Sequence, residues 1–320
     1  DTILNFPFFP SLDGFQRGAV GARRGVQQGR ITATEWVDFL DQTGIESTIL
    51  YPTAGLSCGL IQDPEWAVAV SRGYNSWFHE TYHRTNSRLK GVAMLPLQDI
   101  DAAILELRRA VTKLGAVGGM LPANGGEMGI RKPLGDKSFW PLYEEAEKLG
   151  CALSVHGAPS IGLGINFLAD VPSANILEHP LAQMIQFTSM MRSGMFDKFK
   201  SLRVAYLEAD TGWVPYMVDR LKGKLPDGAI EPTELITSGR VFFSVEADEQ
   251  SLAYTIDRFG DECIIYASDF PHVFKTEQVR EELDELLGRD DIREESLSKI
   301  LRDNAISLYQ LQPEAVPVGR

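Results

Sequence analysis

The chain has 320 residues, a formal net charge of −13 at neutral pH and an apolar fraction of 44%. The composition is typical of a soluble globular protein, and the acidic charge argues against nucleic acid or an anionic membrane as a general partner. No apolar run approaches the roughly 18 residues of a membrane-spanning helix, and no export signal opens the chain. We therefore expect a cytoplasmic protein that acts on a small molecule.

Predicted strands and helices alternate along most of the chain. Apolar runs with turn residues at their ends predict strands at 47–51, 91–95, 116–121, 151–156, 202–208, 241–245 and 263–268, with a weaker candidate at 2–6. A helix capped by Thr32 or Thr34 runs through Thr43, and helical spacing predicts others at 64–84, 101–114, 138–149, 177–195, 213–222 and 250–259. Residues from about 7 to 30 form a predicted long loop, and helices occupy about 275–311.

Continuous apolar strands that alternate with helices predict a parallel sheet covered by helices. With the weak candidate at 2–6, eight strands would close a (β/α)8 TIM barrel. A dinucleotide-binding fold is disfavoured, because Gly162-Leu163-Gly164 follows the wrong strand and lacks the third glycine. We therefore predict one α/β TIM-barrel domain over residues 1–320.

Ionisable side chains follow the last four predicted strands, and in a TIM barrel the chemistry lies where strands end. They are His156, Glu208, Glu246 and Asp269. Such ligands suit zinc, manganese or iron, and a metal with an open position makes a nucleophile from water near neutral pH. The pattern predicts metal-dependent hydrolysis. The alternatives are a turn cap for His156, a salt bridge between Glu208 and Arg220, and a solvated loop for Glu246.

Four segments resemble one family, in the same order along the chain. They are 89–99 (LKGVAMLPLQD), 179–184 (HPLAQM), 202–215 (LRVAYLEADTGWVP) and 266–272 (YASDFPH). Together they are similar to the amidohydrolase-related family, in the branch that contains aminocarboxymuconate semialdehyde decarboxylase and the aromatic-acid decarboxylases. The resemblance covers roughly residues 31–311. It implies a distorted barrel of the metal-dependent-hydrolase type, a homodimer, and one divalent metal, zinc first with manganese or iron as alternatives.

The resemblance also implies roles for individual residues. His156 matches the metal-binding histidine of strand five, and Asp269 matches the terminal aspartate that binds metal and handles the proton of water. Glu208 is expected to complete the coordination or to act as acid–base group. In the hydrolase hypothesis, His179 or His272 positions the substrate in catalysis.

Two positions depart from the family pattern. The decarboxylases typically carry a histidine on strand six, where this chain has Glu208. The family begins with His-x-His or Glu-x-His on strand one, whereas this chain begins with residues 1–6 (DTILNF). We expect a missing or altered N-terminus rather than a site that has lost two ligands.

Substrate contacts are predicted for Tyr51, Trp213 and Arg220, and the first loop carries arginines at 17, 23, 24 and 30 that suit an anionic substrate. The leading hypothesis is a hydrolase in which metal-bound hydroxide attacks a carbonyl of a small, anionic substrate. The second is a non-oxidative decarboxylase of an aromatic or muconate-type acid. The third is a metal-free barrel that binds a small molecule.

Overall fold

The structure is a computed structural model, and it describes residues 31–52, 54–123, 126, 129–158, 163–165, 171–271 and 275–312. Within these ranges seven parallel strands lie side by side in sequence order. They are β1 (Thr48–Leu50), β2 (Leu89–Met94), β3 (Gly118–Ala123), β4 (Ala152–Gly157), β5 (Val204–Leu207), β6 (Val241–Val245) and β7 (Ile264–Tyr266). Each overlaps a predicted strand, with bounds that differ by up to two residues at either end. The weak candidate at 2–6 and the first loop lie outside the described residues.

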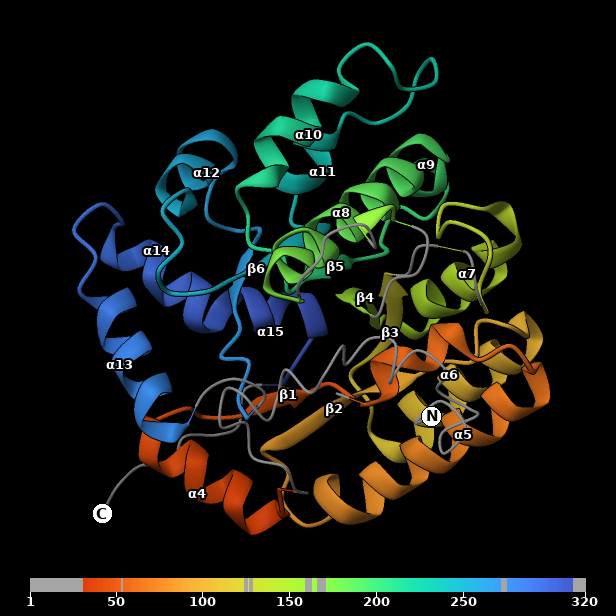
Figure 1. The fold of residues 1–320 in the computed structure, drawn as a ribbon, viewed down its shortest axis with the longest axis horizontal. Helices are drawn as coiled ribbons and strands as arrows, with labels where there is room; N and C mark the ends of the chain where they lie inside the picture. The colour runs from red at the N-terminus through yellow and green to blue at the C-terminus, as the bar shows by residue number, and fades with distance from the viewer. Residues whose placement is uncertain are drawn as a thin grey trace.

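Helices connect the strands, and most of them form an outer ring around the sheet (Figure 1). The longer ones are α4 (Ala33–Thr43), α5 (Pro64–Phe78), α6 (Ile100–Leu114), α7 (Trp140–Leu149), α8 (Val171–Arg192), α10 (Trp213–Leu221), α12 (Leu252–Phe259) and α13 (Thr276–Leu287). The shorter ones are η1 (Ala54–Leu60), η2 (His79–His83), η3 (Lys137–Phe139), α9 (Met195–Lys198), α11 (Pro232–Thr237), α14 (Glu294–Ser298), η5 (Lys299–Asp303) and α15 (Asn304–Tyr309). No helix in the described part of the chain is long and apolar enough to cross a membrane.

Local sequence signals explain several of these boundaries. Thr32 caps α4 in a capping box with Glu35, and Gly44 ends the helix with a φ of 75°, a conformation that glycine adopts without steric cost. Helix α8 begins at Val171, six residues before the predicted start, and Pro180 lies inside it. Proline and polar residues between 171 and 176 have weak helix propensity, and this misled the prediction.

The strand register brings the candidate site residues to one end of the sheet. His156 of β4 lies opposite Leu207 of β5, which directly precedes Glu208. Val245 of β6, directly before Glu246, lies opposite Tyr266 of β7. Because carboxyl ends of parallel strands meet at one edge, this register assembles side chains that are about a hundred residues apart in sequence.

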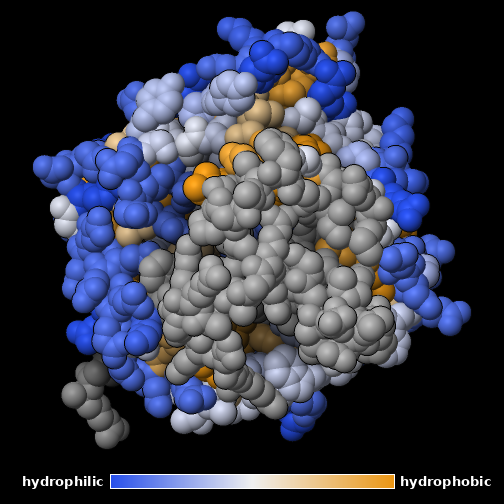
Figure 2. Space-filling view, in the orientation of Figure 1, coloured by the Kyte–Doolittle hydropathy of each residue, from blue (hydrophilic) through white to orange (hydrophobic). Residues whose placement is uncertain are grey.

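The packing of the strands against the helices is almost entirely apolar. All residues of β3 and β6 are buried, as expected for strands that are covered on both faces. On the face shown in Figure 2, the described residues at the periphery are mainly hydrophilic, while hydrophobic ones gather nearer the centre.

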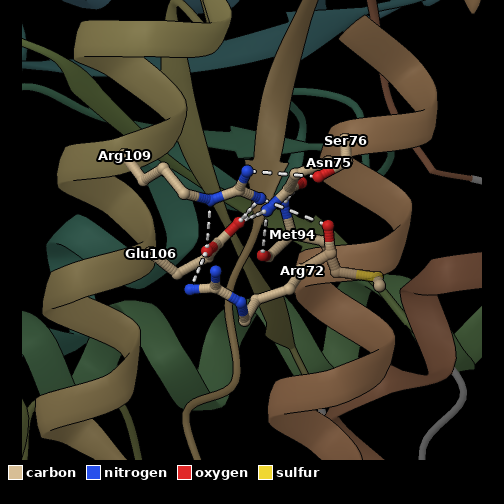
Figure 3. Close-up of polar contacts among 6 residues, drawn as sticks. All are labelled: Arg72, Asn75, Ser76, Met94, Glu106 and Arg109. Atoms are coloured by element: carbon tan, nitrogen blue, oxygen red, sulfur yellow. Dashed lines mark hydrogen bonds and ion pairs between the residues drawn. The ribbon is translucent and has the colours of Figure 1, made fainter. Parts of the chain in front are cut away.

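A buried polar network joins α5, α6 and the end of β2 (Figure 3). Glu106 is 1% exposed and accepts hydrogen bonds from Asn75 at 2.8 Å and from two nitrogens of Arg109 at 2.7 and 2.9 Å. The Asn75 amide in turn pairs with both the N–H and the carbonyl of Met94. Arg72 lies 3.6 Å from Glu106 and adds a second cation. The network therefore fixes the end of β2 relative to two helices.

This network predicts a strong effect on stability. Glu106→Ala leaves the Asn75 amide and the Arg109 guanidinium without their shared acceptor, so we expect the free energy of unfolding to fall by about 3 kcal/mol. Glu80→Ala, which removes an exposed partner of Arg84, is the control and should cost less than about 0.5 kcal/mol. Urea denaturation of both variants measures the difference. If Glu106→Ala lowers the free energy of unfolding by no more than the small loss expected for the control, the network is not important for stability.

Candidate active site

A cavity of about 1340 Å³ reaches the carboxyl ends of the strands. Its lining includes Tyr51, His156, Glu208, Glu246 and Asp269, all of which the sequence pointed to. These residues follow β1, β4, β5, β6 and β7, or lie at their ends. The structure thus brings the strand-end residues together around one space, as the barrel hypothesis requires.

The Glu208 carboxylate lies between two imidazoles. Its Oε2 atom is 3.3 Å from Nδ1 of His156 and 3.2 Å from Nδ1 of His179, which comes from α8. Nδ1 of His156 is also 2.8 Å from the carbonyl of Gly157, so this nitrogen carries the hydrogen. Burial opposes protonation of His179, but the Glu208 carboxylate outweighs it and raises the pKa of His179 to about 9. His179 therefore holds a proton near neutral pH, next to the Glu208 carboxylate.

Three carboxylate residues at the strand ends have a left-handed backbone. The φ angles are 65° for Glu208, 55° for Asp210 and 49° for Asp269. This region costs of order 1 kcal/mol or more for residues with a side chain, so surrounding contacts must maintain it. One such contact is a 2.8 Å hydrogen bond from the N–H of Glu208 to Oγ of Ser244. Backbone strain that clusters at one cavity supports a functional site there.

Two further carboxyl groups, those of Glu246 and Glu282, lie near Asp269. Partial burial, together with the charges of Asp210 and Asp269, raises the pKa of Glu246 to about 7. Partial burial also raises the pKa of Glu282, from α13, to about 7, and Tyr266 donates a hydrogen bond to it. Near neutral pH these groups exchange protons readily, which is a property of acid–base sites.

Aromatic contacts position two of the cavity residues. Phe270, directly after Asp269, stacks on Phe39 of α4 with centroids 3.8 Å apart, and α4 therefore anchors the end of β7. The hydroxyl of Tyr51 lies 2.6 Å from that of Tyr309 in α15, and the Tyr51 ring lies 5.1 Å from the His156 ring. Tyr51 thus forms a wall beside His156, and its contact with substrate stays a prediction.

The structure does not bring Trp213 and Arg220 to this cavity. Trp213 is buried in the core, edge-on to Phe187 and Phe243, because the first turn of α10 packs inward. Arg220 is exposed on the last turn of α10 and is not a partner of Glu208. Neither residue lines this cavity, so their substrate contacts stay predictions that its geometry does not support. His272 and the arginines at 17, 23, 24 and 30 lie outside the described residues.

The structure adds residues that sequence reasoning missed. They are Gly157, Gln183, Asp210, Ser244 and Glu282. Gly157 lies close to His179 and Glu208, since a Cβ atom built on it would lie 2.5 Å from Nδ1 of His179 and 2.8 Å from Oε2 of Glu208. Asp210 and Gln183 stand inside the resembling segments, and that is the only sequence signal for them.

The described residues do not by themselves make the metal site of the family. Imidazole and carboxylate donors suit zinc, manganese or iron, and His156, Glu208 and Asp269 supply them. Yet in the described ranges no three His, Cys, Asp or Glu side chains form a group that could hold a metal ion. Residues 1–30 contain no histidine, cysteine or glutamate. His156, Glu208 and Asp269 are therefore the described residues that would hold such an ion, and they do not form a complete site by themselves.

The family model described as Amidohydrolase matches residues 30–311. This chain belongs to the amidohydrolase family. Its curated relatives lie in the branch named from the sequence. The 2-amino-3-carboxymuconate-6-semialdehyde decarboxylase of Dictyostelium discoideum is 25% identical over 270 residues, which cover 82% of this chain and 72% of that protein. A gamma-resorcylate decarboxylase of Rhodococcus jostii is 26% identical over 296 residues, 85% of each chain.

Solved structures confirm the predicted amidohydrolase-type TIM barrel. A 2,6-dihydroxybenzoate decarboxylase in complex with 2,6-dihydroxybenzoate superposes with a TM-score of 0.75 at 24% identity, over 94% of each chain. A dihydroxybenzoic acid decarboxylase of Polaromonas, with bound manganese and the inhibitor 2-nitroresorcinol, superposes with a TM-score of 0.71 at 22% identity, over 86% of this chain and 85% of that one.

The close approach at Gly157 predicts a sensitive position. In Gly157→Ala the new methyl group must displace His179 or Glu208, and we expect overpacking to cost about 1–3 kcal/mol of stability. Gly73→Ala in α5 is the control, because its Cβ meets nothing within 4 Å. That change should stabilise the chain by about 0.5–1 kcal/mol. Thermal unfolding measures both, and a Gly157→Ala chain as stable as the parent would contradict the crowding.

Proposed function

We propose that this member of the amidohydrolase family is a lyase that removes carbon dioxide from an aromatic or conjugated carboxylic acid. The observation that carries the proposal is the decarboxylase activity in the names of relatives that match most of the chain. The sequence placed metal-dependent hydrolysis first, and these relatives favour its decarboxylase alternative. The hydrolase remains the second candidate, because an acid–base site at strand ends suits both reactions.

The chemistry of decarboxylation fits the side chains around the cavity. When the bond to the carboxylate breaks, carbon dioxide leaves and the electron pair stays on the substrate carbon, which then takes a proton. Glu208 stands where the resembled decarboxylases typically carry a histidine. Here His179 brings an imidazole within 3.2 Å of Glu208, and Glu208 lines the cavity, so a proton of His179 can reach the cavity through Glu208. Tyr51 and Phe270 provide aromatic surface along the cavity.

Product analysis tests the reaction class. With 2,6-dihydroxybenzoate and 5-carboxyvanillate as probes in deuterated water, we expect carbon dioxide release and one deuterium on the product carbon. A parallel reaction in ¹⁸O-labelled water should leave the product unlabelled. Incorporation of ¹⁸O without carbon dioxide release would overturn the decarboxylase in favour of the hydrolase.

The proton donor is tested by substitution. His179→Asn keeps a polar group of similar size but cannot transfer a proton, so kcat should fall by about 10²–10⁴-fold while KM changes little. Arg220→Gln is the control, because Arg220 is exposed and does not contact Glu208. Steady-state kinetics, on whichever probe the parent chain converts, gives kcat and KM for both variants. If both variants keep parental kcat, His179 is not the donor.

A divalent metal and a homodimer stay predictions for this chain. The Polaromonas relative contains manganese, and zinc first, with manganese or iron as alternatives, is expected here with His156 and Asp269 as ligands. Elemental analysis of the purified chain should find about one such ion per chain. Less than ~0.1 ion per chain, with no effect of added zinc or manganese on the melting temperature, would favour the metal-free binding protein.

A further inference from the structure

Gln183 lies in α8 about one helical turn after His179, so both side chains project from the same face of the helix. It is 0% exposed. Its Nε2 atom donates two hydrogen bonds, at 3.0 Å to the carbonyl of Val155 and at 2.7 Å to the carbonyl of Leu207. One buried amide therefore joins the ends of two strands.

The two carbonyls belong to the residues directly before His156 and Glu208. Strands β4 and β5 are neighbours, and His156 lies opposite Leu207 in their register. The Gln183 amide therefore bridges the strands at the point where the chain leaves the sheet and turns toward the cavity. Glu208, the next residue after Leu207, has a left-handed backbone, so the contact lies directly before that turn.

The other atom of the amide reduces what Gln183 contributes to stability. Its Oε1 atom is buried and has no hydrogen-bond partner among the described residues. Its orientation is fixed, because both carbonyls only accept hydrogen bonds and the amide must turn its NH₂ group toward them. A buried polar atom without a partner costs about 1–3 kcal/mol, a cost that an apolar side chain of similar size would avoid.

We propose that Gln183 is a positioning residue that sets the separation of His156 and Glu208. Together with His179 on the same helical face, it makes α8 the element that holds both imidazoles against the shared carboxylate. Gln183 itself does not line the cavity, so it acts through the strand ends rather than on the substrate. The inference rests on the proposed decarboxylase for its kinetic measurement but not for its structural one.

The test compares Gln183→Met with Gln186→Met. Gln186 lies on the same helix, is 2% exposed, and accepts a hydrogen bond from the N–H of Leu134 at 2.8 Å. The control thus removes a buried amide of the same kind whose hydrogen bond to Leu134 lies away from β4 and β5. Crystal structures of both variants give the distance from Nδ1 of His156 to Oε2 of Glu208, which is 3.3 Å in the parent chain.

In Gln183→Met we expect this distance to grow by about 1 Å and kcat on the turned-over probe to fall by about 100-fold at nearly constant KM. The melting temperature should stay close to that of Gln186→Met, whose distance and kcat should match the parent. A Gln183→Met chain with parental distance would overturn the inference, even if no probe is turned over. So would a Gln183→Met chain that unfolds while Gln186→Met folds, because the role would then be stability of the fold.

Discussion

The position of the Glu208 carboxylate between two imidazoles is the contact on which the site depends. His156 reaches it from the end of β4, and His179 reaches it from α8. Three features of the fold make this contact possible. They are the parallel register of β4 and β5, the left-handed backbone of Glu208, and the absence of a side chain at Gly157. Because the three residues come from separate elements, a change in helix or strand packing far from the cavity would alter the distances between Glu208 and the two imidazoles.

The sequence predicted the sheet well, because each strand is a continuous apolar run that ends at a turn residue. That signal does not depend on distant contacts, so the order of residues along the chain is enough to place His156, Glu208 and Asp269 at strand ends. It was harder to predict which residues of a helix face the cavity, the core or the solvent. Trp213 and Arg220 stand on α10 beside a site motif, but the first packs into the core and the second faces solvent. Motif proximity along the chain does not determine which way a helix presents its residues.

The roles of Gly157 and Gln183 could not be predicted for a different reason. A glycine at the end of a strand and a glutamine within a helix are common and have no sequence signature of their own. Their importance comes from distances to residues more than twenty positions away, such as 2.5 Å from a Cβ at Gly157 to Nδ1 of His179. Only the packing of α8 on the sheet reveals such contacts.

The acidity of the cavity constrains how an anionic substrate can bind. Glu208, Glu246 and Asp269 all line it, and burial together with the charges of neighbouring carboxylates raises the pKa of Glu246. A carboxylate substrate gains binding energy there only if a cation or a shared proton offsets this repulsion. Protonated His179 and a protonated Glu246 offer such compensation close to neutral pH. The same protons are the ones that a substrate carbanion needs, so substrate binding and protonation are coupled in a decarboxylase. Hydrolysis by contrast needs a base to activate water, and each proton that helps an anion bind removes one such base.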